Sequence, residues 1–143
     1  MNLKTITLSI LLLCIVTSYS VNGQNNSIFK PKYKFESKLK NKKDIQLLCW
    51  TEKSVYTVSD TIVLIVEANK IFDYYPPFDL KIPGLKKGAT NSSTKINNGI
   101  IKAYTLIYFT PLKTGKIIIP KIKALIDRKY YYTKKYNIRI VSN

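Results

Sequence analysis

The stretch from Gly99 to Val141 constrains the fold of this chain most strongly. It holds three runs rich in β-branched and aromatic residues, and residues typical of turns separate them: Ile101–Phe109, Lys116–Ile126 and Tyr130–Val141. Apolar runs without helical periodicity, broken by Gly, Pro and Asp, are typical of consecutive antiparallel strands. The stretch therefore predicts an all-β fold.

The preceding residues continue this pattern. Strands are expected over Ile45–Thr51, Ser54–Val58, Thr61–Ala68 and Phe78–Ile82, with a weak edge pairing over Gly88–Ser93. Seven to nine strands with closely spaced turns predict an immunoglobulin-like antiparallel β-sandwich over residues 44–143. The Cys…Trp…Cys pattern of antibody domains is absent, so the prediction concerns the architecture alone.

Alternation along the strands predicts which side chains form the core. In Ile101–Phe109 the odd-numbered residues are assigned to the core, and Lys102, Tyr104, Leu106 and Tyr108 to the other face. Pro120 has no amide hydrogen, so it should interrupt the ladder. Further core positions are expected at Ile117, Ile119, Ile122, Ala124, Ile126, Ile138 and Ile140.

The first 23 residues have the features of a secretory signal peptide. One positive charge at Lys4 precedes the apolar run Ile6–Val16, which is shorter than the roughly 20 residues that span a bilayer. Cleavage is expected after Gly23 or after Ser20, and an uncleaved anchor is the alternative. Acylation of Cys14 is disfavoured, because a lipoprotein signal needs a small residue at the position of Leu13. We therefore expect export to the periplasm or cell envelope.

Residues 24–43 form a basic segment without clear periodicity, interpreted as an extended, flexible arm. The whole chain carries 24 Lys and Arg against 8 Asp and Glu, a net charge of +16. Removal of residues 1–23 takes away one lysine, Lys4, and leaves +15. A basic arm with aromatic residues suits nucleic acid, but export makes a solvated tether the favoured interpretation.

Lysines outside the arm suggest a second kind of surface. Lys102, Lys116, Lys121 and Lys123 fall on predicted strands or turns and are candidate contacts for a polyanion such as anionic lipid or acidic glycan. The alternative is that the lysines reflect composition, since a chain rich in Lys, Asn, Ile and Tyr is typical of an AT-rich genome.

An aromatic loop around Pro76-Pro77 is the candidate protein contact. Tyr74, Tyr75 and Phe78 are expected at one end of the sandwich, and Tyr and Phe are common in interface cores. The competing interpretation is that these rings fold back over the open end of the core.

Catalytic chemistry is not indicated. The chain has no histidine and its 5 glycines are scattered, so neither a His-based triad nor a phosphate-binding glycine loop is present. Cys49 is interpreted as a buried hydrophobic residue. Asp73 and Asp79 are interpreted as turn residues rather than an acid/base pair or a cation site. We expect no enzyme activity, no cofactor, no metal and no small-molecule substrate.

The region from Lys53 to Val141 resembles the extracytoplasmic part of BatD, the oxygen tolerance (aerotolerance) family of bacterial envelope proteins. The residues that carry the resemblance are Ser54–Asp60, Pro76–Leu80, Asn97–Gly99, Tyr104–Pro111, Gly115–Pro120, Tyr130–Tyr132 and Ile138–Val141. Family members are usually longer, with several such domains and a membrane helix near the C-terminus. The resemblance implies a short, single-domain relative and provides no catalytic residues.

Two functions follow as expectations. The resemblance implies a non-catalytic protein-interaction module of a Gram-negative envelope, linked to oxygen or stress tolerance. Its partners would be envelope proteins such as von Willebrand A-type or tetratricopeptide-repeat proteins, reached through an exposed edge strand. The alternative, which rests on charge, is a secreted β-sandwich that binds polyanions; nucleic acid is disfavoured as a partner.

Overall fold

The computed structural model describes residues 34–76 and 79–143, which are all-β and contain no helix. The chain divides into two units, Met1–Glu36 and Ser37–Asn143. The predicted signal peptide, the first part of the predicted arm and Phe78 lie outside the described residues. Among the described residues, no helix is long and apolar enough to cross a membrane.

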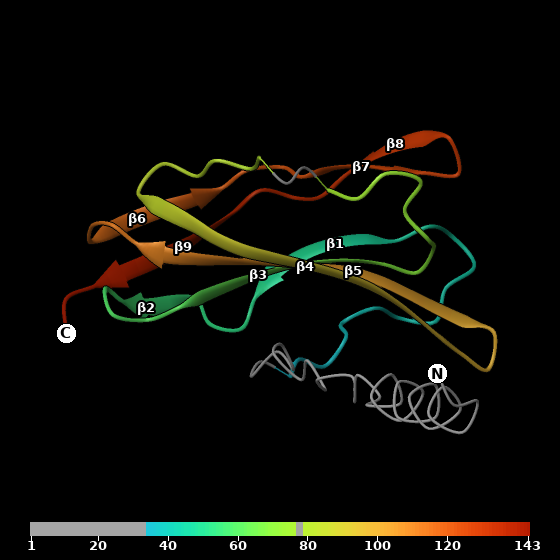
Figure 1. Ribbon diagram of the computed structural model, residues 1–143, viewed down its shortest axis with the longest axis horizontal. Helices are drawn as coiled ribbons and strands as arrows, with labels where there is room; N and C mark the ends of the chain where they lie inside the picture. The colour runs from blue at the N-terminus through green and yellow to red at the C-terminus, as the bar shows by residue number, and fades with distance from the viewer. Residues whose placement is uncertain (1–33, 77–78) are drawn as a thin grey trace, which may run out of the picture. The chain divides into compact units, whose positions relative to one another are not determined.

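The described residues of the second unit form nine strands (Figure 1). They are β1 (Leu47–Thr51), β2 (Val55–Thr57), β3 (Ile62–Ala68), β4 (Leu85–Asn97), β5 (Ile100–Pro111), β6 (Gly115–Ile119), β7 (Lys123–Ile126), β8 (Lys129–Tyr132) and β9 (Tyr136–Val141). One sheet has the order β1-β3-β5-β4, a second has β2-β9-β6, and β7 pairs with β8. All pairs are antiparallel except β2 with β9.

This topology confirms the predicted sandwich. The order β1-β3-β5-β4 matches the A-B-E-D order of immunoglobulin-like domains. In the opposite layer, β6–β7 and β8–β9 occupy the places of strands F and G. Tyr74 forms an isolated antiparallel bridge with Leu125, so the segment around it lies where strand C would be. The count of nine strands is the upper end of the predicted range.

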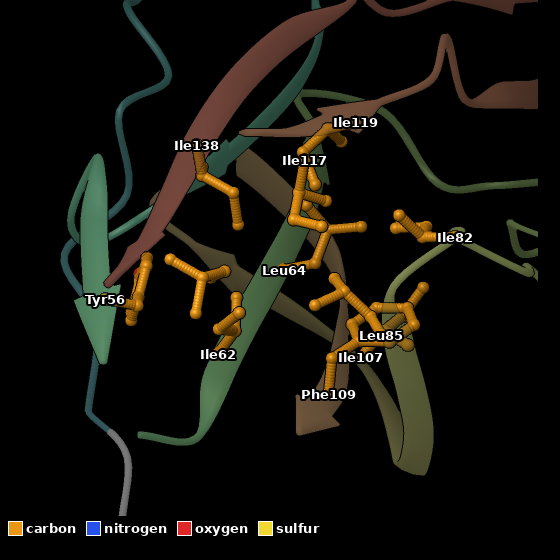
Figure 2. Close-up of a cluster of buried hydrophobic side chains, with 11 residues drawn as sticks. Tyr56, Ile62, Leu64, Ile82, Leu85, Ile107, Phe109, Ile117, Ile119 and Ile138 are labelled. Carbon is orange, nitrogen blue, oxygen red and sulfur yellow. The ribbon is translucent and has the colours of Figure 1, made fainter. Parts of the chain in front are cut away.

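Two clusters of buried side chains fill the space between the layers. The first draws on β3 and β5 from one layer and β6 and β9 from the other (Figure 2). It contains Tyr56, Ile62, Leu64, Ile82, Leu85, Ile107, Phe109, Ile117, Ile119, Ile138 and Ile140. The second contains Val66, Ala68, Phe72, Ala103, Ile122, Ala124 and Ile126. The core positions predicted on the last three strand runs are therefore confirmed, except that Ile101 is half-buried and belongs to neither cluster.

Two details of the strand prediction were wrong. Residues 79–82 form no strand, because Pro76 and Pro83 enclose the segment and neither donates a backbone hydrogen bond. Leu106 is predicted on the face of β5 away from the core, yet only 2% of it is exposed. It lies opposite Ile65 of β3, which in turn lies opposite Trp50 of β1, so it belongs to an apolar row on that face.

The predicted weak edge pairing is a full strand. β4 pairs with β5 from Leu85 to Asn97, with one irregularity between Lys87 and Thr90. The β4–β5 turn consists of Asn98 and Gly99, whose φ values of 49° and 75° are those of a type I′ turn. The Asn-Gly pair therefore sets this register, as its sequence indicates.

Candidate interaction surface

The β6–β7 and β8–β9 segments form one long hairpin that carries the candidate surface. The pairing keeps step in both halves of the hairpin. Ile119 pairs with Tyr136, and Lys123, four residues later, pairs with Tyr132, four residues earlier. The two strands therefore keep one register across the break at Pro120. Figure 1 shows β7 and β8 extending away from β6 and β9 toward the right of the view.

Thr133 restores the hydrogen bonding of the β-ladder next to Pro120, which interrupts it. The backbone N–H of Ile122 donates to the Thr133 hydroxyl at 2.8 Å, and this hydrogen bond is buried. The N–H of Thr133 donates to the Ile122 carbonyl at 3.0 Å. A side chain thus replaces one main-chain acceptor, and this keeps β7 and β8 aligned with the rest of the hairpin.

The outer face of this hairpin carries exposed tyrosines in adjacent rows. Tyr74, Leu125 and Tyr130 form one cross-strand row, and Lys123 with Tyr132 forms the next. The exposed fractions of Tyr74, Tyr130 and Tyr132 are 66%, 60% and 58%. The Lys123 ammonium lies 3.7 Å from the centre of the Tyr130 ring, a cation–π contact. We call these five residues the tyrosine face.

A groove runs along part of this surface. It has a volume of about 510 Å³, and its described lining is Asp73, Tyr74, Tyr75, Lys123, Ala124, Leu125 and Tyr130. Asp73 holds one wall of the groove in place. The backbone N–H of Asp73 donates to the Leu125 carbonyl at 2.9 Å, and the Asp73 carboxylate accepts from the backbone N–H of Arg128 at 2.6 Å. Asp127 and Arg128 have positive φ, so the β7–β8 turn is also type I′.

The structure separates the predicted aromatic contacts. Tyr74 is exposed on the tyrosine face, whereas Tyr75 turns inward and packs against the second core cluster. The Tyr75 ring lies 5.4 Å from that of Phe72, and its hydroxyl lies 3.3 Å from the hydroxyl of Thr94. Each of the two interpretations drawn from the sequence thus fits one residue: the exposed contact fits Tyr74 and the core role fits Tyr75. Tyr130 and Tyr132, absent from the predicted contact, join Tyr74.

The predicted polyanion contacts do not lie together. Lys116 is exposed on β6 opposite Arg139 of β9, and Lys121 and Lys123 are exposed farther along the hairpin. Lys102 is in the other layer, on β5, where it is half-buried and lies opposite Lys95 of β4. Paired like charges of this kind repel each other across a ladder.

Lys102 instead lines a cleft together with the lysine-rich segment that precedes β1. A cleft of about 380 Å³ is lined by Lys40, Lys42, Lys43 and Lys102, together with Leu39, Asn41, Asn69, Gly99, Ile100 and Ile101. Residues 37–43 have no helix or strand, and hydrogen bonds between Lys40 and Gln46 and between Lys42 and Asn69 hold them against the sandwich. Sequence reasoning missed this grouping because it depends on how the segment is fastened to β3.

Cys49 and Tyr136 form a half-buried pair of titratable groups. Burial raises the pKa of the Cys49 thiol from its ordinary value of 9.0 to about 12. Burial and the nearby Cys49 thiol raise the pKa of Tyr136 above its usual range. Cys49 is a free, half-buried cysteine that packs against both core clusters, so its environment is that of a packing residue rather than a nucleophile.

Other chemistry is sparse. Among residues 34–76 and 79–143, no group of three His, Cys, Asp or Glu side chains could hold a metal ion. Asp73 is hydrogen-bonded to the β7–β8 turn, as expected for a turn residue, and Asp79 is exposed. No protein-family model, curated protein or solved structure matches the chain.

Proposed function

We propose that this protein is a non-catalytic, BatD-like interaction module of the bacterial cell envelope, and that it binds another envelope protein through the tyrosine face. The proposal combines the sequence resemblance over Lys53–Val141 with the expected signal peptide. A link to oxygen or stress tolerance, and von Willebrand A-type or tetratricopeptide-repeat proteins as partners, are parts of this proposal that come from the resemblance alone.

The observation that supports it is the exposure of three tyrosine rings on one face, two of which, Tyr74 and Tyr130, line the groove. Outward positions of a sandwich strand are usually polar, yet Tyr74, Tyr130 and Tyr132 are each more than half exposed. Tyrosine offers a large rigid area with a polar end, and it is enriched at protein interfaces. Interface hot spots are also rich in tyrosine, so these three rings are the expected anchors.

The test uses two neighbouring tyrosines as a matched pair. Tyr74→Ala should leave the melting temperature within about 2 °C of wild type, because surface substitutions usually change stability by less than about 0.5 kcal/mol. It should also abolish recovery of the partner after crosslinking in cells and mass spectrometry. Tyr75→Ala should lower the melting temperature by several degrees, because it removes a core-packed ring.

Two results would count against the proposal. One is partner recovery that is unchanged in Tyr74→Ala and in Tyr130→Ala. The other is recovery of no protein above background with the wild-type chain. If only Tyr75→Ala loses partner recovery, and this variant is also destabilised, the exposed rings do not contact the partner.

A second candidate function, polyanion binding, is favoured by the cross-strand pairs of like charge. Lys95 lies opposite Lys102, and Lys116 lies opposite Arg139. A bound anion would relieve the repulsion within each pair. Retention on immobilised heparin that falls steeply with salt is the expected result, since screening weakens exposed charge interactions. No retention at low salt would remove this candidate.

A further inference from the structure

We propose that the cleft beside Lys102 is a binding site for a ligand that carries several phosphate groups. This inference rests on the second proposed function, polyanion binding, and gives it a site and a ligand class. The cleft is formed by Lys40, Lys42, Lys43 and Lys102, whose side chains come from two distant parts of the sequence. Its volume of about 380 Å³ is within the range of small-ligand sites.

Charge is the first argument. Four lysines line the cleft, and none of its described lining residues is acidic. Lys95, which lies opposite Lys102 across the β4–β5 ladder, adds a fifth positive charge nearby. Bringing these charges together costs free energy, which a multiply charged anion in the cleft would recover.

The site is also held in place before any ligand binds. The amide side chain of Asn69 donates to the carbonyls of Lys42 and Asp44, at 3.3 and 2.8 Å, and accepts from the N–H of Gln46 at 2.8 Å. The side chain of Gln46 in turn accepts from the N–H of Lys40 at 3.2 Å. Asn69 follows β3 directly, so the lysine-rich segment is fixed to the end of a core strand.

The upstream end of the segment is fixed as well. The buried Glu67 carboxylate accepts from the N–H of Lys38 at 2.7 Å and from the indole N–H of Trp50 at 3.1 Å. The Lys38 ammonium lies 4.3 Å from the centre of the Trp50 ring. With both ends held, the backbone that carries Lys40, Lys42 and Lys43 needs little ordering when a ligand binds, and this lowers the entropic cost.

The lysines of the cleft are suited to phosphate. All the cations that line the cleft are lysines, and lysine binds phosphate groups as a compact point charge. A phosphate ester carries about −1.5 to −2 charges at neutral pH, so two or three such groups would balance four or five lysines. Soluble phosphorylated sugars and phospholipid headgroups share this chemistry.

The experiment compares two variants: one loses four positive charges at the cleft, and the other loses four positive charges elsewhere. The cleft variant replaces Lys40, Lys42, Lys43 and Lys102 by Gln. The matched control replaces Lys81, Lys113, Lys134 and Lys135 by Gln, which gives the same net charge from exposed positions that neither line the cleft nor belong to a cross-strand pair of like charges. Binding of inositol hexakisphosphate is measured by calorimetry at low ionic strength, with thermal melts to show that both variants fold.

The expected result is an affinity loss of about tenfold to a thousandfold in the cleft variant, because each exposed charge pair contributes a factor of up to about five. The control should lose less than about threefold. Equal losses in the two variants would overturn the site and leave general polyanion binding intact. If the wild-type chain binds neither heparin nor inositol hexakisphosphate, the second proposed function fails together with the site.

Further arms identify the ligand class and its source. Vesicles of phosphatidylcholine with and without phosphatidic acid test for a lipid headgroup, and inositol hexakisphosphate tests for a soluble ester. Cleft-dependent binding in either arm supports the proposal and names the source. Cleft-dependent binding of polygalacturonate that is tighter than binding of both phosphate probes would overturn phosphate in favour of a carboxylated glycan.

Discussion

Replacing Thr133 by Val tests how the long hairpin is held together. The substitution keeps the branched shape of the side chain and removes its hydroxyl, which is the acceptor for the Ile122 N–H at 2.8 Å. Thr133 is 3% exposed and Ile122 is 1% exposed, so water has little access to replace that acceptor. A buried donor left without a partner costs about 1–3 kcal/mol.

The expected change in melting temperature follows from that cost. For a domain the size of residues 37–143, 1 kcal/mol corresponds to about 4 °C, so Thr133→Val should melt about 4–12 °C lower. Differential scanning calorimetry measures the shift. Hydrogen exchange gives the location: the Ile122 amide should lose protection, while the Thr133 amide, which donates to the Ile122 carbonyl at 3.0 Å, should keep it.

Thr133→Ser is the control. It keeps the hydroxyl and removes one methyl group, which costs about 0.8 kcal/mol of burial, and the Ile122 amide should remain protected. The reasoning is refuted if Thr133→Val is as stable as wild type and still protects the Ile122 amide. It is also refuted if both variants lose protection to the same degree, because the hydroxyl would then not be the element that matters.

Other predictions concern backbone strain and pH. Gly84→Ala should destabilise by about 2–4 kcal/mol in urea unfolding, because φ is +87° and the new Cβ would lie 2.7 Å from Cδ1 of Ile117. Gly99 also has positive φ, but a Cβ added there would meet no atom within 4 Å, so Gly99→Ala should destabilise by only about 1–2 kcal/mol. Equal losses of stability in the two variants would refute a role for the contact with Ile117. The Cys49 thiol should resist alkylation at pH 8 until the protein unfolds, since burial raises its pKa to about 12. Because the folded-state pKa is above the unfolded value of 9.0, stability should fall as pH rises from about 9 toward 12, and Cys49→Ala should flatten that fall; an equal slope would refute the assignment.

Local sequence signals predicted most of the fold. Alternating Ile residues identified the inward face of β6, β7 and β9, and the Asn98-Gly99 pair identified the β4–β5 turn. β4 was harder to recognise, because its Gly, Asn and Lys residues have little strand propensity. It forms a strand since it lies alongside β5, so its pairing is a tertiary effect.

The candidate sites were less predictable because they depend on contacts between distant segments. Tyr74 and Tyr75 are adjacent in the sequence, yet Tyr74, which bridges to Leu125, is exposed, whereas Tyr75 packs against the second core cluster. The cleft beside Lys102 depends on Asn69, whose side chain holds a segment some 25 residues earlier in the chain. Neither relation has a periodic signal in the sequence.

The constant register of the long hairpin restricts how its length can change. Along each strand of the hairpin every second residue faces inward, but at the break the spacing is three, from Ile119 to Ile122 and from Thr133 to Tyr136. On each strand the inward-facing residues therefore switch between odd and even numbers, and the two switches lie opposite each other. A one-residue insertion or deletion in one strand alone would expose half of its core side chains. Viable length variants should change both strands together, or change the β7–β8 turn.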